Sequence, residues 1–549
     1  VKKSKAQKTK AYDMYARFFR WASDRIEDDG IICFITNNSY VNKRTFDGFR
    51  KSIQDEFQFA YVIDLGGNIT DLSGKDGIFL NEKNTIFGQA AAVGISIAFF
   101  IKDKRRKLQQ CQINYIHPCD IRATRDEKIS FLQTHKFEQI EFDNILPDNK
   151  NNWIDLTDND FNDLLPLCDK DVKLGRKSEA LFENFTLGII TARDEWVYDY
   201  NPEDLSKKVN YLINAYNVDV EKHFGKTDSI DLKNVVDYTI KWTRAVKKDL
   251  SKGKKYVYDK NLIVESLYRP FTKRFLYFSK ELNEMQNKIP AMYGHDGLRS
   301  NMSLIFTDAG SQKPFMVGIT NKIGDYHFVG SASGAQFLSL YNFDKDGRKS
   351  DNITDWGLEQ FATHYNNNSI TKEKIFHYVY AVLHHPTYRT KYELNLKREF
   401  PRIPFYDNFW QWAQWGKQLM ELHINYESAE LFALQQLEIT YELTNAAAWE
   451  KMTKPKLKAN KAAGSIEIDG FTTLEGIPAT AWDYKLGNRS ALEWILDQYK
   501  EKKPSDPTIA EKFNTYKFAD YKEQVIDLLK RVCTVSVETM KIVNEMPRE

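Results

Sequence analysis

The sequence predicts an α/β protein, because helices and apolar strands alternate over its first 120 residues. Residues 12–26 carry apolar side chains at helical spacing, and the run GIICFIT that follows is a continuous apolar strand, typical of strands buried on both faces of a sheet. Residues 43–57 predict a second helix, and FAYVIDLGG predicts a second strand that ends in two glycines. This order is typical of an open, doubly wound sheet, of which these residues supply the second half.

The end of this first region is predicted to be an antiparallel hairpin. A polar loop that contains glycines leads to the apolar run VGISIAFFIK, and the basic turn KDKRRK separates it from QQCQINYIHP. Two apolar runs joined by a short polar turn favour hairpin pairing.

The rest of the chain predicts a second, larger region. Residues 121–185 become acidic and polar and are expected to link the two regions. Short strands and helices mix over residues 186–440. Residues 441–549 begin with a basic linker and are expected to end in helices over 489–502 and 519–545 that pack on the preceding region.

Composition narrows the class of protein. No run of about 18 apolar residues occurs, so no membrane span is expected. The five cysteines have no paired spacing, which fits a reducing cytosol. The net charge is +2, from 78 basic and 76 acidic residues, so only local clusters can indicate a nucleic-acid partner.

The order of the elements resembles that of adenine-specific DNA methyltransferases. The segment YDMYARFFRWASDRIEDDGIICFITNNSYV resembles the one that follows the catalytic Asn-Pro-Pro-Tyr motif, and YVIDLGGNI and NTIFGQAAAVGISIAFFIK continue in the family's order. Later segments are similar to single-chain type ISP restriction–modification enzymes, which carry a nuclease, a translocase, a methyltransferase and a target-recognition domain. These segments are LGIITARDEWVYDYN, SLYRPFTKRFLYFS, TDAGSQKPF and YKLGNRSALEWILDQYK.

The resemblance implies the distal half of a Rossmann-like methyltransferase domain (residues 1–120), an α+β target-recognition region (186–440) and a helical C-terminal segment (441–549). No Asn-Pro-Pro occurs in the sequence, so the catalytic motif and the glycine-rich cofactor loop are expected upstream of Val1. The intact enzyme is expected to act in the bacterial cytoplasm and to methylate adenine in double-stranded DNA with S-adenosylmethionine. This chain alone is expected to be inactive without its methyltransferase, translocase and nuclease regions, whether these lie on the same or on a separate chain.

Two other functions stay open on the sequence. A catalytically inert DNA-specificity module that works with a separate catalytic chain would have the same recognition region. An α/β enzyme that does not act on DNA could have the same sheet with a truncated first half. An upstream reading frame with a glycine-rich loop and Asn-Pro-Pro-Tyr would favour the methyltransferase.

Four residues are predicted near the target base. An enzyme that modifies adenine must flip it out of the duplex, and an aromatic ring can then stack on it. Phe87 matches the family position of that ring; the alternative is a core residue that closes a loop. Asn37, Asn38 and Tyr40 follow the first predicted strand, at the end where open α/β sheets place ligands; the alternative is a capped turn. Asp64 is expected to be structural.

Clusters of basic residues predict a DNA-binding surface, since Lys and Arg neutralise phosphates. The run KWTRAVKKDLSKGKKYVYDK is rich in lysine, and LYRPFTKRFLYFS interleaves cations with aromatic residues. A solvated charged face is the alternative for the first run, and a buried structural arginine is the alternative for Arg269. The candidate phosphate contacts are Lys241, Arg244, Lys247, Lys248, Lys254, Lys255, Arg269, Lys273 and Arg274.

Residues that read base edges are expected on loops of the recognition region. Gln and Lys side chains presented in a groove can form such contacts. Gln312 and Lys313 in TDAGSQKPF, and Gln336 in SASGAQF, are predicted to lie on flexible loops rich in Gly and Ser. Arg193 and Asp194 are instead predicted to pair with each other and fix a loop.

Overall fold

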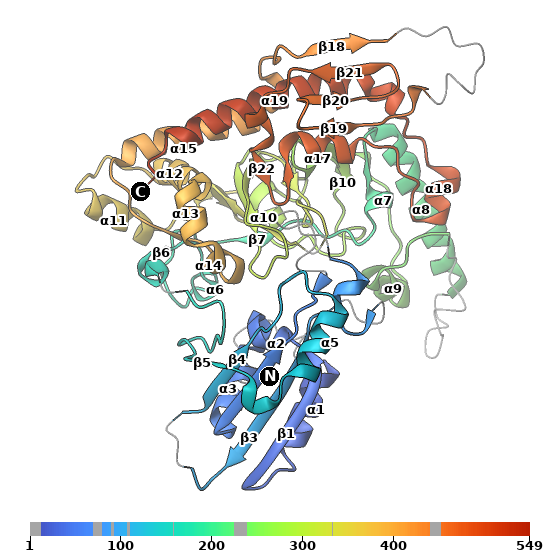
Figure 1. The fold of residues 1–549 in the computed structure, drawn as a ribbon. Helices are drawn as coiled ribbons and strands as arrows, with labels where there is room; N and C mark the ends of the chain where they lie inside the picture. Colours follow the sequence, from blue (N-terminus) through green and yellow to red (C-terminus); the bar gives the residue numbers. More distant parts are fainter. Residues whose placement is uncertain are drawn as a thin grey trace. The chain divides into compact units, whose positions relative to one another are not determined.

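The computed structural model describes residues 13–69, 80–88, 93–106, 110–157, 159–223, 239–331, 333–439 and 452–548. The chain divides into two compact units, residues 1–158 and 159–549 (Figure 1). The described residues form one hydrophobic core in the first unit and two in the second. None of the helices in this part of the chain is long and apolar enough to span a membrane.

The first unit is built on a five-stranded sheet with the order β1-β3-β2-β4-β5 (Figure 1). β3 runs antiparallel to both β1 and β2, whereas β2 and β4 are parallel. The elements are α1 Met14–Ser23, β1 Asp29–Asn37, α2 Ser39–Asn42, α3 Asp47–Glu56, β2 Phe59–Asp64, β3 Ile95–Asp103, β4 Gln112–Ile116, α5 Arg125–Thr134 and β5 Asp143–Ile145.

The predicted hairpin of β3 with β4 is wrong. β3 lies between β1 and β2, so that Phe100 is paired with Ile32 on one side and Ala60 on the other, while β4 pairs with the far side of β2. Ala98 and Phe100 are completely buried, and a central position in the sheet provides that burial. A short polar turn permits a hairpin but does not force one.

Helices α1 and α3 cover one face of this sheet. Phe19 of α1 and Ile53 of α3 share a core with Phe100, and the ring of Phe19 lies 5.2 Å from that of Phe100. On the other face, Ile31 and Ile35 of β1 are 63% and 61% exposed. The sequence predicts a β1 buried on both faces, but in the described structure only one face is covered.

The first unit continues past residue 120, into the segment predicted to be a linker. β5 pairs with β4, and Trp153 is buried with its ring 6.4 Å from that of Tyr40. The buried guanidinium of Arg50 donates to the main-chain carbonyls of Tyr40 and Asn151. β5 has three residues and no apolar run, so periodicity could not predict it.

The described residues of the second unit form three four-stranded sheets. In order across each sheet, the first has β13 Ile323–Gly324, β9 Ile263–Arg269, β10 Thr272–Tyr277 and β8 Tyr198–Asp199; the second has β12 Val317–Thr320, β11 Ser303–Thr307, β14 Ala335–Ser339 and β7 Thr186–Leu187; the third has β18 Gln435–Glu438, β21 Thr472–Glu475, β20 Ser465–Glu467 and β19 Lys458–Asn460.

Helices surround these sheets. The longer ones are α8 Pro202–His223, α9 Arg244–Ser251, α11 Asp355–His364, α12 Lys372–His384, α15 Phe409–Ile424, α17 Ala491–Gln498 and α19 Lys522–Glu545. The shorter elements are β6 Leu165–Pro166, α6 Lys170–Lys173, α7 Asp194–Val197, α10 Ile289–Tyr293, β15 Tyr341–Phe343, β16 Lys349–Asp351, α13 Pro386–Lys391, α14 Glu393–Arg398, β17 Arg402–Ile403, β22 Lys485–Leu486, β23 Arg489–Ser490 and α18 Pro507–Lys512.

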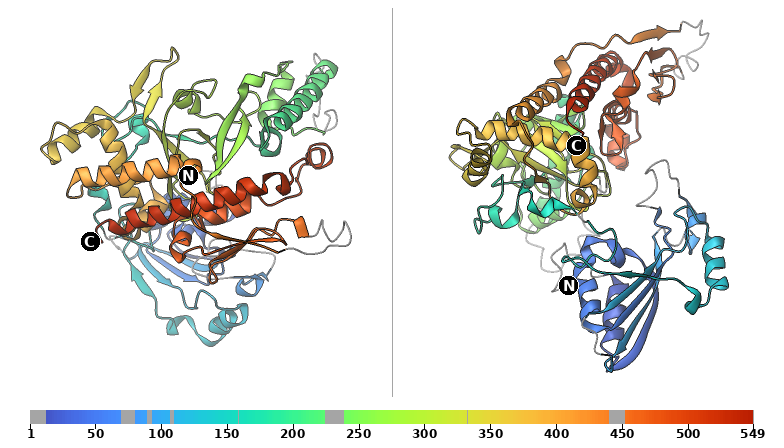
Figure 2. Two further views of the ribbon diagram at one scale, coloured as in Figure 1. Left: turned by 90° about the horizontal axis from the view of Figure 1, so that it is seen from above. Right: turned by 60° about the vertical axis from the view of Figure 1, so that its left-hand side comes forward.

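The C-terminal helices are packed into the second unit. α19 lies beside α15 (Figure 2), and Leu529 of α19 shares a core with Leu276 of β10. α15 in turn packs closely on α12, because a Cβ at Gly416 would lie only 1.8 Å from the carbonyl oxygen of His377. The segment after residue 440 therefore completes the core of the preceding region.

Candidate nucleic-acid interface

The carboxyl ends of β1 and β2 are joined by hydrogen bonds. Asn38 donates to Asp64 across 2.8 Å, and the same carboxylate accepts from the main-chain N–H of Gly66 at 2.9 Å and the hydroxyl of Tyr115 at 3.2 Å. Asp64 is buried. Asp64 thus holds the two strand ends together, and the side-chain NH2 of Asn38 is used in this hydrogen bond.

Phe87 lies on the loop that connects β2 to β3. Its ring is 52% exposed. The loop is fixed from within: Asn84 donates to the carbonyl of Arg122 at 2.7 Å, and the hydroxyl of the buried Thr85 donates to the carbonyl of Gly88 at 2.9 Å. Within the described residues of this chain, Phe87 is therefore not part of the core. Contact with a base stays a prediction.

The structure corrects the assignment of Tyr40 to the base pocket. Tyr40 is completely buried, its hydroxyl accepts a hydrogen bond from Ser96, and its ring packs on Phe49 and Phe100. The short helix α2 begins at the end of β1 and directs this side chain into the core. Asn37 accepts from the main-chain N–H of Ser39, as the capped-turn alternative expects.

The lysine-rich run forms α9 and the turn after it. Val246 and Leu250 are buried and anchor the helix. The cations with carboxylate partners are Arg244, 3.4 Å from Glu284; Lys254, 2.9 Å from Glu281; and Lys255, 2.7 Å from Glu221. Within the described residues, Lys241, Lys247 and Lys248 have no carboxylate within 4 Å. Their ammonium groups are therefore not neutralised within this part of the chain, and their contact with phosphates stays a prediction.

Arg269 is not part of an exposed surface. Its guanidinium is buried and donates to Asp325 at 2.7 Å, while Asp194 lies 3.9 Å away. Burial raises the pKa of Asp325 to about 6, although the guanidinium of Arg269 opposes this rise. Arg269 is therefore a buried structural arginine, which was the alternative interpretation for this position.

The predicted pair of Arg193 and Asp194 is not formed. Arg193 donates to the hydroxyl of Thr243, whereas Asp194 accepts from the hydroxyls of Thr191 and Tyr268. The two side chains point to different partners because α7 begins between them, with Arg193 as its N-cap residue. Each still fixes the segment between β7 and β8 to neighbouring elements.

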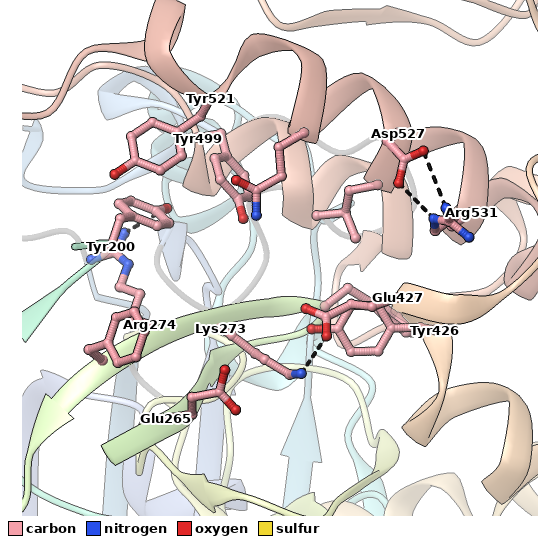
Figure 3. A pocket seen from close by; sticks show the side chains of 14 residues that line it. Tyr200, Glu265, Lys273, Arg274, Tyr426, Glu427, Tyr499, Tyr521, Asp527 and Arg531 are labelled. Carbon is pink, nitrogen blue, oxygen red and sulfur yellow. Dashed lines mark hydrogen bonds and ion pairs between the residues drawn. The ribbon is translucent and has the colours of Figure 1, made fainter. Parts of the chain in front are cut away.

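Lys273 and Arg274 line a cleft of about 390 Å³ between β10 and α19 (Figure 3). The guanidinium of Arg274 lies 4.5 Å from the ring centre of Tyr200 and 4.3 Å from that of Tyr268, and donates to the Tyr200 hydroxyl. Lys273 pairs with Glu427. Arg274 is held between two rings inside the unit, which argues against its assignment to a DNA-facing surface. Lys273 is partly exposed beside an exposed glutamate, and its contact with DNA stays a prediction.

The predicted base-reading residues lie in two different settings. Gln312 and Lys313 are partly exposed in the loop between β11 and β12. Gln336 is instead buried in β14 and donates to Asp308 at 3.0 Å, which corrects its placement on a loop. Gln336 is followed by Phe337 and Leu338, which are buried in the same strand. These apolar residues favour a strand despite the glycine that precedes it.

Comparisons with known proteins identify the family. Residues 180–528, more than half of the chain, match the model of the type ISP C-terminal specificity domain, and residues 1–69 match that of the Eco57I restriction–modification methylase. The chain belongs to the type ISP restriction–modification family. A search of curated proteins found no match.

Solved structures of proteins in complex with DNA match the whole chain. A DrdV–DNA complex is 44% identical with a TM-score of 0.90, and this chain covers 53% of it. A nuclease-deletion mutant of the type ISP enzyme LlaGI with a DNA substrate mimic is 28% identical (TM-score 0.82, 49% covered), and the ATP-dependent type ISP enzyme LlaBIII bound to DNA is 26% identical (TM-score 0.83, 35% covered). Each alignment covers 100% of this chain, which spans about half the length of the first two matched chains.

Within the segment YKLGNRSALEWILDQYK, no candidate site residue was predicted from the sequence. The hairpin of β22 and β23 packs against the loop that carries Lys313: a Cβ at Gly487 would lie 3.8 Å from the Cβ of Lys313 and 3.4 Å from Val329. Asn488 is exposed at the tip. The Gly-Asn pair between two short runs is a turn signal that could have predicted this hairpin.

Proposed function

We propose that this chain is part of an adenine-N6 DNA methyltransferase of the type ISP family, in which it supplies a wall of the base pocket and target recognition. Phe87 is the observation that carries the proposal, because it combines an exposed ring with a loop fixed by hydrogen bonds. The order β1-β3-β2, with the middle strand antiparallel to its neighbours, supports a distal half of a Rossmann-like domain.

Among the described residues, the acid at the end of β2 is not free to bind the ribose of S-adenosylmethionine. This acid, Asp64, is engaged by Asn38, Gly66 and Tyr115. We therefore assign no chemical step to this chain. β1 is an edge strand of the described sheet, and its exposed Ile31 and Ile35 support the proposal that the cofactor-binding half of the domain continues the sheet beside β1 and covers this face in the intact enzyme.

The experiment that tests this function uses the full-length protein that contains these residues. Incubation with duplex DNA and methyl-labelled S-adenosylmethionine should place label on adenine N6, detected by mass spectrometry of the digested nucleosides. Label on cytosine would contradict the adenine assignment. DNA binding without any methylation or cofactor binding would favour the inert specificity module.

Replacing Lys247 and Lys248 with methionine is expected to weaken binding to every DNA sequence. Each lost phosphate contact lowers the slope of log K against log salt by about 0.9, so the pair should lower it by about 2. Binding of duplexes with and without the target site, measured between low and moderate salt, provides the slope. The matched control replaces Lys254 and Lys255, which already pair with carboxylates and should change the slope less. Equal slopes for wild type and both double variants would indicate that α9 is a solvated charged face that does not contact DNA.

Replacing Gln312 and Lys313 with alanine is expected to relax sequence preference. A lost base contact costs about 1–3 kcal/mol at the base pair that it reads. Competition binding with duplexes that differ at single positions measures this loss. Gln411, exposed on α15, is a matched control that should leave preference unchanged. If the double variant keeps the recognised sequence and its affinity, other residues read the bases.

A further inference from the structure

A buried lysine supports the loop that carries Phe87. Lys128 of α5 is 1% exposed, and its ammonium donates to the main-chain carbonyl of Asn84 at 2.6 Å. The Asn84 amide donates in turn to the carbonyl of Arg122, shortly before α5. The main-chain carbonyl and the side-chain NH2 of Asn84 are therefore both bonded to the segment around the start of α5. Asn84 lies three residues before Phe87 in the loop.

The same point of the loop is packed against the end of β2. Gly67 has a φ of +87°, and a Cβ there would lie 2.7 Å from the carbonyl oxygen of Asn84 and 3.2 Å from the ammonium nitrogen of Lys128. Side chains are excluded at such distances, so glycine allows the main chain that follows β2 to approach the loop. Lys128, Asn84 and Gly67 thus form one contact group in the loop segment that leads to Phe87.

The ammonium of Lys128 is expensive to bury. Within the described residues no carboxylate lies within 4 Å of it, and burial lowers its pKa from the ordinary value. A buried charge without a carboxylate partner destabilises a fold unless hydrogen bonds compensate it. An apolar side chain of similar length would fill the space without this cost. The ammonium therefore acts through the hydrogen bond that it donates to the loop.

We infer that Lys128 is a positioning residue for Phe87, which holds the loop so that the ring stays exposed and ready to stack on an extrahelical base. The inference rests on the proposed function, in which Phe87 stacks on the target adenine. A loop that is ordered before binding loses less conformational entropy when the base arrives. Loss of Lys128 should therefore impair base capture while leaving duplex binding intact.

The test uses Lys128→Met in the full-length protein. Hydrogen exchange of the amides of residues 84–88, measured without DNA, should become about tenfold faster or more as the loop loses its anchor. Fluorescence of 2-aminopurine at the target position should fall to the level of Phe87→Ala, with duplex affinity within about twofold of wild type. Because both residues act through one ring, the double variant should capture the base no worse than Phe87→Ala alone.

Two further variants keep the result interpretable. Lys51→Met removes an exposed lysine on α3 and should change neither exchange nor fluorescence. Lys128→Gln retains a neutral hydrogen-bond donor, so it should capture the base better than Lys128→Met does. If Lys128→Met folds poorly, the comparison of Lys128→Gln with wild type still tests the role of the hydrogen bond. Unchanged exchange at 84–88 in the folded variants overturns the inference whatever Phe87 does. Wild-type capture by Phe87→Ala together with faster exchange in Lys128→Met would instead overturn the proposed stacking, and the positioning role with it.

Discussion

Arg269→Met is expected to lower the free energy of unfolding of the second unit by about 3–5 kcal/mol, the range for removing one partner of a buried ion pair. Arg269, at the end of β9, contacts Asp325 beyond β13 and lies near Asp194 in α7. Without the guanidinium, a buried carboxylate is left beside a second acid. Urea unfolding followed by tryptophan fluorescence measures the loss.

The controls separate burial from charge. Lys255→Met breaks an exposed ion pair with Glu221 and should cost less than about 1 kcal/mol. Adding Asp325→Asn to Arg269→Met should recover part of the loss, because the amide can still accept from the main-chain N–H of His327. A loss below about 1 kcal/mol for Arg269→Met would show that the pair does not hold these elements together.

The loss should also depend on pH. Arg269 lowers the pKa of Asp325, so its removal moves this pKa above its present value of about 6. A carboxyl group whose folded-state pKa is raised above the ordinary 3.8 contributes stability at low pH and loses it as pH rises through the folded-state pKa. The difference between Arg269→Met and wild type should therefore be largest near neutral pH and smaller near pH 5, at matched pH.

Local periodicity predicted the helices well and the sheet order poorly. The helix expected over 519–545 is α19, Lys522–Glu545, because its apolar spacing is set by the residues of the helix itself. The position of β3 between β1 and β2 depends on which neighbours bury Ala98 and Phe100, and no local pattern contains that information. Short strands such as β5 leave too few residues for a period to be seen.

The sequence could not predict which of the candidate cationic side chains are exposed to solvent. Lys247 and Arg274 both lie in segments rich in cations, yet of the two only Lys247 is without a stacked or paired partner within the described residues. The cleft around Arg274 is closed by α19, which follows some 250 residues later. Long-range packing of this kind decides whether a cation faces solvent or an internal ring, and composition does not reveal it.

Phe87→Ala in the full-length enzyme is expected to impair capture of the target adenine by about 1–3 kcal/mol, the free energy that stacking on an aromatic ring contributes per base. The effect should fall on the flipped base rather than on duplex binding, because a ring stacks only once the base is extrahelical. Fluorescence of 2-aminopurine at the target position reports the unstacked base, and filter binding reports the affinity for the duplex.

The exposed ring makes the two explanations of Phe87 separable. Since the side chain is half exposed, Phe87→Ala should leave the melting temperature nearly unchanged, whereas loss of a core phenylalanine costs about 3–5 kcal/mol. Phe87→Trp retains an aromatic face and has room for its bulk, so it should keep most of the base capture. A sharp fall in melting temperature for Phe87→Ala, with flipping preserved in the folded fraction, would place the ring in the core of the intact enzyme and refute its role in the pocket.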